Sequence, residues 1–103
     1  MAKELFAKAK GKIIPFEQNG EFFYRKAKKY EESNQYIDAL DFYRKAVEKD
    51  PENVYYMLDL AETFTEMSYF EESNKILFSM LHRGKMVSDC YFGLGCNFLG
   101  LQD

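Results

Sequence analysis

A step of 34 residues relates three segments of this 103-residue chain, and it constrains the fold more than any other feature of the sequence. Each segment places a small residue between two large apolar ones. The three sets, in chain order, are Phe23, Ala27 and Tyr30, then Met57, Ala61 and Phe64, then Tyr91, Gly95 and Phe98. Helices approach closely where one presents a small residue and bulky neighbours fill the adjacent space. The repetition therefore predicts helices stacked in a regular array.

The residues between these segments follow the same step and predict a second helix in each period. Apolar and small residues recur there three and four positions apart. The matched pairs are Tyr36 and Phe70, Ala39 and Ser73, Tyr43 and Leu77, and Ala46 and Met80. Pro51 ends the first helical pair, because proline cannot continue a helix interior but fits a first turn. Gly84 follows a basic stretch that begins at His82, which is typical of a helix end.

The period, the small residues and aromatics of the three copies, and Pro51 resemble the tetratricopeptide repeat. The resemblance covers residues 20–103 and implies an all-α helix-turn-helix repeat solenoid, with about two and a half repeats forming a right-handed superhelix. It predicts a basic N-terminal extension at 1–19, a first repeat at 20–53, a second at 54–87, and at 88–103 the first helix of a partial third repeat.

In this family the first helix of each pair lines a concave groove in which ligands bind. Carried over by position, the groove residues are Tyr24, Lys28, Tyr55, Leu58, Glu62 and Phe92. Their neighbours on the same wall are Glu21, Thr65, Asp89 and Cys96. These positions are not those that the repeat uses for internal packing. Exposed aromatics often dominate interface energies, and the acidic neighbours favour a protein or peptide partner with basic and apolar character. The resemblance thus implies a non-enzymatic protein–protein interaction module or scaffold.

Three other readings stay open. Residues 1–19 carry lysines beside apolar residues and could fill the groove themselves. The apolar composition of 88–103 differs from the polar outer face that usually closes a repeat array. The chain is therefore either a fragment of a longer array, which we favour, or a self-assembling module that forms homo-oligomers through 88–103. It could also be the regulatory domain of a larger enzyme that continues beyond Asp103.

The residues that usually carry catalysis or hold a metal are few. His82 is the single histidine and lies at a predicted helix end. Cys90 and Cys96 would be about 9 Å apart along a helix, which is too far for a disulfide, and a zinc site needs more ligands at closer spacing. We expect no catalytic residues, no metal and no cofactor, and structural thiols at both cysteines.

The charge balance and the hydropathy pattern narrow the class of partner. The net charge of −3 argues against general attraction to nucleic acid. No apolar run approaches the roughly 18–20 residues that cross a bilayer, and no apolar stretch follows the N-terminal lysines as it would in a secretory signal. The sequence predicts a cytoplasmic protein that binds neither nucleic acid nor membrane.

Overall fold

The computed structural model describes residues 19–102, so the extension predicted at 1–19 lies, apart from Asn19, outside the described residues. This part of the chain is all-helical, as predicted, and contains no strand. Its five helices are α2 (Gly20–Glu32), α3 (Tyr36–Lys49), α4 (Val54–Glu66), α5 (Phe70–His82) and α6 (Val87–Gln102).

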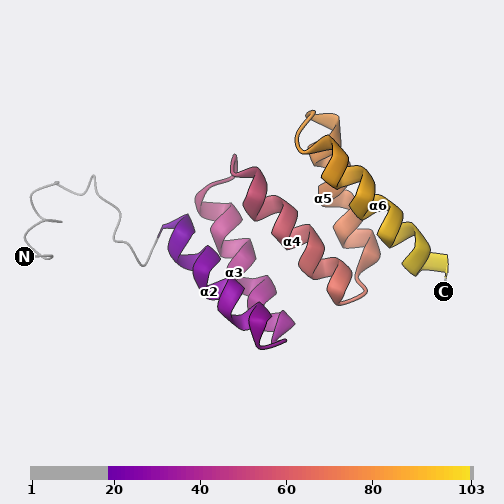
Figure 1. Ribbon diagram of the computed structural model, residues 1–103. Helices are drawn as coiled ribbons and strands as arrows, with labels where there is room; N and C mark the ends of the chain where they lie inside the picture. The colour runs from indigo at the N-terminus through magenta and orange to yellow at the C-terminus, as the bar shows by residue number, and fades with distance from the viewer. Residues whose placement is uncertain (1–18, 103) are drawn as a thin grey trace, which may run out of the picture.

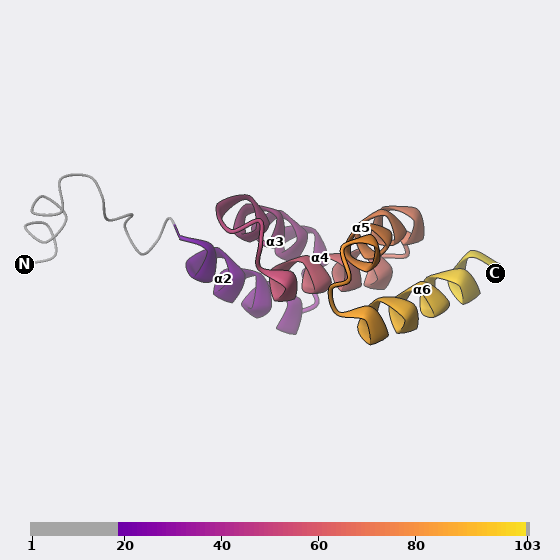
Figure 2. The same cartoon turned by 90° about the horizontal axis from the view of Figure 1, so that it is seen from above.

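The helices form an elongated array in which each one packs on the next. Figure 1 shows α2 at one end of the array and α6 at the other. Seen from above, α2, α4 and α6 lie along one side, while α3 and α5 lie along the other (Figure 2). Besides the contacts between successive helices, α4 also contacts α6. The first helices of the predicted pairs therefore share one layer, and α4 and α6 are neighbours within it.

The 34-residue step recurs in the backbone of the turns and caps. Asn19 and Asn53, 34 positions apart, both cap a helix N-terminus by accepting backbone N–H groups with their side chains. Asn34 and Ser68 are likewise 34 positions apart and both have positive φ, at 60° and 65°. The residue after each of these turns donates its backbone N–H to the backbone carbonyl of an aromatic residue. Gln35 donates to Tyr30 at 2.9 Å, and 34 positions later Tyr69 donates to Phe64 at 2.8 Å.

The small residues of the first two copies are packed as the sequence predicts. Ala27 and Ala61 are both fully buried. In the first copy, Phe23 and Tyr30 both stack on Phe42 of α3, with ring centroids 6.2 and 5.5 Å apart. A small residue thus lets the two helices of a pair approach, and the aromatic rings on either side fill the remaining space.

The third copy differs, and the expected close packing of Gly95 is wrong for the described residues. Apart from its two chain neighbours and the backbone of its own helix, no heavy atom lies within 4 Å of the place that a Cβ on Gly95 would occupy. α6 instead meets α5 with its opposite face. A Cβ on Gly93 would lie 2.8 Å from the Leu77 side chain, and one on Gly100 would overlap the Phe70 ring. These two glycines, rather than Gly95, permit the contact between α5 and α6.

A buried polar cluster fixes α6 against the preceding helices. Asn97 is fully buried. Its amide nitrogen donates to Ser73 Oγ and to Asn74 Oδ1, both at 2.8 Å, and its Oδ1 accepts from Thr65 Oγ1 at 2.6 Å. No buried side-chain nitrogen or oxygen within residues 19–102 lacks a partner. Because only one register of α6 satisfies this cluster, Asn97 determines where α6 lies relative to α4 and α5.

We expect Asn97→Leu to lower the free energy of unfolding by about 1–3 kcal/mol, because it removes three hydrogen bonds from a buried cluster and leaves only the Thr65 and Ser73 hydroxyls bonded to each other. Urea denaturation followed by circular dichroism measures this loss. Gln102→Leu, the same kind of change at an exposed position of the same helix, is the control and should stay within about 0.5 kcal/mol of the parent. Equal stability of both variants would contradict the role given to Asn97.

Candidate functional site

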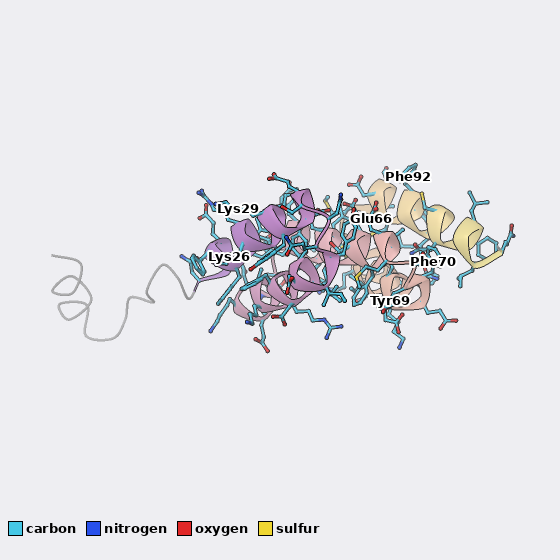
Figure 3. The ribbon with its side chains drawn as sticks, turned by 90° about the horizontal axis from the view of Figure 1, so that it is seen from below. Lys26, Lys29, Glu66, Tyr69, Phe70 and Phe92 are labelled. Carbon is cyan, nitrogen blue, oxygen red and sulfur yellow. The ribbon has the colours of Figure 1, made fainter. Side chains whose placement is uncertain are left out.

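A pocket of about 290 Å³ opens between α4 and α6, with α5 behind it; we call it the α4–α6 pocket. Its apolar lining comes from Leu58 of α4, Leu77 of α5 and Phe92 of α6. Phe92 is 76% exposed, so its ring is available to a partner. Figure 3 labels Phe92 and Glu66 on the two helices that flank the pocket. The pocket exists because Asn97 holds α6 beside α4 through Thr65, while the Gly93 backbone approaches Leu77 of α5.

Four carboxylates line the same pocket. They come from three helices and are Glu31, Glu62, Glu66 and Asp89. None of the described lining residues is basic. Glu31 reaches the pocket from the end of α2 and accepts a 2.6 Å hydrogen bond from the hydroxyl of Tyr43, which is itself fully buried. The pocket thus combines an apolar wall with an acidic lining that the fold holds in place.

The crowding of these carboxylates shifts the protonation of Glu62. Desolvation in the pocket raises the pKa of Glu62, and the neighbouring charges of Asp59, Glu31 and Asp89 raise it further, whereas Lys28 acts in the opposite direction. The like charges are therefore only partly compensated. A cation that enters the pocket would lower the electrostatic free energy of the cluster.

Three of the six predicted groove residues meet at the α4–α6 pocket. Leu58, Glu62 and Phe92 line it. Their predicted neighbours Thr65, Asp89 and Cys96 line it as well. The structure does not bring Tyr24, Lys28 or Tyr55 into this lining. Tyr55 lies in the first turn of α4 and is 63% exposed.

The expectation that groove residues take no part in internal packing is wrong for Tyr24 and Leu58. Tyr24 stacks on Tyr56 with ring centroids 4.7 Å apart, and its hydroxyl donates to Asp59 Oδ2 at 2.5 Å. Lys28 pairs with the same carboxylate at 3.6 Å. Leu58 is half-buried against the cluster formed by α4, α5 and α6. Tyr24 is covered because α2 and α4 approach closely enough for their side chains to meet, whereas Leu58 is covered by the packing of α5 and α6 against α4.

The groove prediction missed two acidic residues of the pocket, Glu31 and Glu66. Glu66 lies one helical turn after Glu62, so the spacing of four positions could have revealed it. Glu31 carries no such signal, because it reaches the pocket only through the packing of α2 against its neighbours.

A second hollow lies at the other end of the array and has the opposite charge. It is formed by α2 and the turn that follows it, and carries Arg25, Lys26 and Lys29 among its lining residues. Figure 3 shows Lys26 and Lys29 on α2 at the far end from Phe92. The Lys26 ammonium lies 5.6 Å from the centre of the Phe42 ring, which is within the range of a cation–π contact.

The remaining side chains that could react or bind a metal, one histidine and two cysteines, are separate from one another. His82 is exposed at the end of α5, Cys90 is buried, and Cys96 is exposed; both thiols are free. Burial raises the pKa of the Cys90 thiol. Within residues 19–102, no three His, Cys, Asp or Glu side chains are placed to hold a metal ion. No helix in this part of the chain has the length and apolar character to span a membrane.

Comparison with known proteins identifies no similar protein. No protein-family model matches the chain, and no curated protein or solved structure matches it.

Tyr24 and Tyr43, whose hydroxyls bond to carboxylates of neighbouring helices, make the free energy of unfolding depend on pH in the alkaline range. Burial raises the pKa of Tyr24 and of Tyr43 well above the usual value of a phenol, and the carboxylate partners Asp59 and Glu31 add to the shift. An unfolded tyrosine ionises near pH 10. The stability that these phenols contribute is therefore complete below about pH 10 and is lost as the pH rises through the folded-state values.

We accordingly expect the free energy of unfolding to fall with rising pH above about 10, and to fall less steeply in the double variant Tyr24→Phe, Tyr43→Phe. Urea titrations at a series of alkaline pH values measure both slopes. Identical slopes would show that these two hydrogen bonds do not couple folding to proton release.

Proposed function

We propose that this chain is a non-enzymatic interaction module of the tetratricopeptide type, a helical repeat solenoid that binds a peptide or protein segment in the α4–α6 pocket. One observation carries the proposal: four carboxylates and the exposed ring of Phe92 line a single pocket. The proposed partner presents a Lys or Arg side chain next to an apolar one. A cytoplasmic setting, with the free thiols of Cys90 and Cys96, belongs to the same proposal.

The backbone periodicity supports the solenoid part of the proposal. Both the N-caps of α2 and α4 and the positive-φ turn residues Asn34 and Ser68 recur at a spacing of 34 residues. A structural unit that repeats in its caps and turns, and not just in its apolar pattern, is the basis of a solenoid.

The size of the pocket supports a segment rather than a whole small molecule as the ligand. Pockets for small molecules usually have volumes of about 300–1,000 Å³, and the α4–α6 pocket lies at the lower limit with about 290 Å³. That space suits one or two side chains of a longer partner. A guanidinium or ammonium group would form charge-assisted hydrogen bonds with Glu62, Glu66 or Asp89, while an apolar neighbour would pack on Phe92.

Tyr24 and Lys28 take a supporting part in this proposal. Both hold Asp59, which lies in the same helix as Leu58 and Glu62. They would act on the partner by fixing α4 relative to α2, without touching the partner themselves.

The proposal is tested with an array of synthetic peptides in which the content of Lys or Arg and the content of Leu or Phe vary independently. We expect binding to require both classes. For the tightest peptide, Glu62→Gln and Phe92→Ala should each weaken the affinity roughly tenfold, which corresponds to about 1.4 kcal/mol. Fluorescence anisotropy with the labelled peptide measures these affinities.

Phe78→Ala is the matched control for Phe92→Ala, because Phe78 is an aromatic of α5 that is 57% exposed and is not part of the pocket. It should leave the affinity unchanged. Equal binding of acidic and basic peptides, or an unchanged affinity in both pocket variants, would refute the proposed function.

A further inference from the structure

The exposed apolar surface of this protein is concentrated on α6. Ten large apolar side chains are exposed in the described part of the chain, and six of them belong to this one helix. Tyr91, Phe98 and Leu99, with Gly95 between them, share the side turned away from α5, and we call these four residues the outer face of α6. The three side chains are 63%, 66% and 67% exposed. Such a concentration marks an interaction surface rather than a solvated helix.

The outer face repeats a surface that is covered elsewhere in the molecule. Its Tyr91, Gly95 and Phe98 stand at the same positions of the 34-residue step as the sets around Ala27 and Ala61. In those sets the small residue is fully buried, and α2 and α4 pack against α3 and α5. In α6 the corresponding surface lacks a covering helix within the described residues. The residue positions that form the internal helix contacts are therefore also present on α6, and one more helix is needed to cover them.

The charge of α6 indicates what kind of helix can cover it. Asp89 is the single charged residue among the sixteen residues of α6, and it lines the α4–α6 pocket rather than the outer face. A second α6 placed on this face would meet no like charge. The absence of a side chain at Gly95 also allows another backbone to approach closely there.

We propose that a second copy of this chain covers the outer face, through an α6–α6 contact about a two-fold axis that passes near Gly95. The paired helices within one chain are joined by short turns and run antiparallel. The same arrangement between copies places Gly95 against Gly95 of the second copy, and Tyr91 against Leu99 of the second copy. This contact is isologous, since each copy contributes the same surface.

The outer face supplies about half of the area that a standard interface buries per partner. Three large side chains, each about two-thirds exposed, offer roughly 300–450 Å² of apolar area per copy. A standard interface buries about 800 Å² per partner, and the exposed polar residues Ser88 and Gln102 at the two ends of the helix can supply part of the remainder. The same register places Phe98 opposite Phe92 of the second copy, so the dimer and the proposed peptide binding both use the exposed ring of Phe92.

Sedimentation equilibrium of the full chain tests the proposal. We expect a mass of twice 12.2 kDa, and Phe98→Glu should reduce it to that of one chain while circular dichroism shows the parent's helix content. Phe78→Glu, the same change at an exposed aromatic of α5, should stay dimeric. A monomer at all concentrations, or a dimer that survives Phe98→Glu, would overturn the proposal. A monomer that binds a separate helical peptide on α6 would also overturn it, because the occupant would then be a different chain.

Disulfide trapping tests the geometry without relying on a disruptive variant. In a Cys96→Ser background, Gly95→Cys should form a disulfide-linked dimer on mild oxidation, because the two Gly95 positions lie within disulfide range across a close helix contact. Ser88→Cys in the same background is the control. It should not cross-link, since Ser88 lies two turns from the axis and faces Gln102 of the second copy. Failure of Gly95→Cys to cross-link, or equal cross-linking of both variants, would contradict the antiparallel contact.

Discussion

The close approach of paired helices at Ala27 and Ala61 is the constraint on which the rest of the structure depends. Both residues are fully buried, and the aromatic rings beside Ala27 stack on Phe42 across the helix pair. Larger side chains there would separate the helices and open gaps that the rings could not fill. Because the two positions are 34 residues apart, the same contact occurs twice along the chain and pairs α2 with α3 and α4 with α5 (Figure 2).

The α4–α6 pocket follows from that pairing together with one polar cluster. Asn97 bonds to both α4 and α5 and so fixes α6 in one register. Gly93 lets the same helix approach Leu77, while Phe92 stays exposed beside the carboxylates. The contacts of Asn97 and Gly93 that hold α6 in place are thus also the ones that shape the proposed binding site. On its other side the same helix exposes an apolar face, so α6 links the site to the end of the array.

The helices and half of the predicted site could be anticipated from sequence, because both follow from periodicity along single helices. Leu58 and Glu62 are one turn apart, and Phe92 stands 34 positions after Leu58. The misplaced residues depend on packing between helices instead. Tyr24 belongs to the predicted groove positions, but its ring stacks on Tyr56 of α4. Gly95 fits the small-residue pattern, but its face has no covering helix within residues 19–102. Neither outcome is encoded in spacing alone.

The central claim is that the acidic, aromatic pocket between α4 and α6 is the binding surface. It is tested most directly by recording amide NMR spectra of the labelled full chain during titration with a short peptide that contains Lys and Leu. The account predicts that the largest shifts cluster at pocket residues such as Leu58, Glu62 and Gly93. Shifts centred on Arg25 and Lys29 at the opposite end, or no saturable shifts at all, would contradict it.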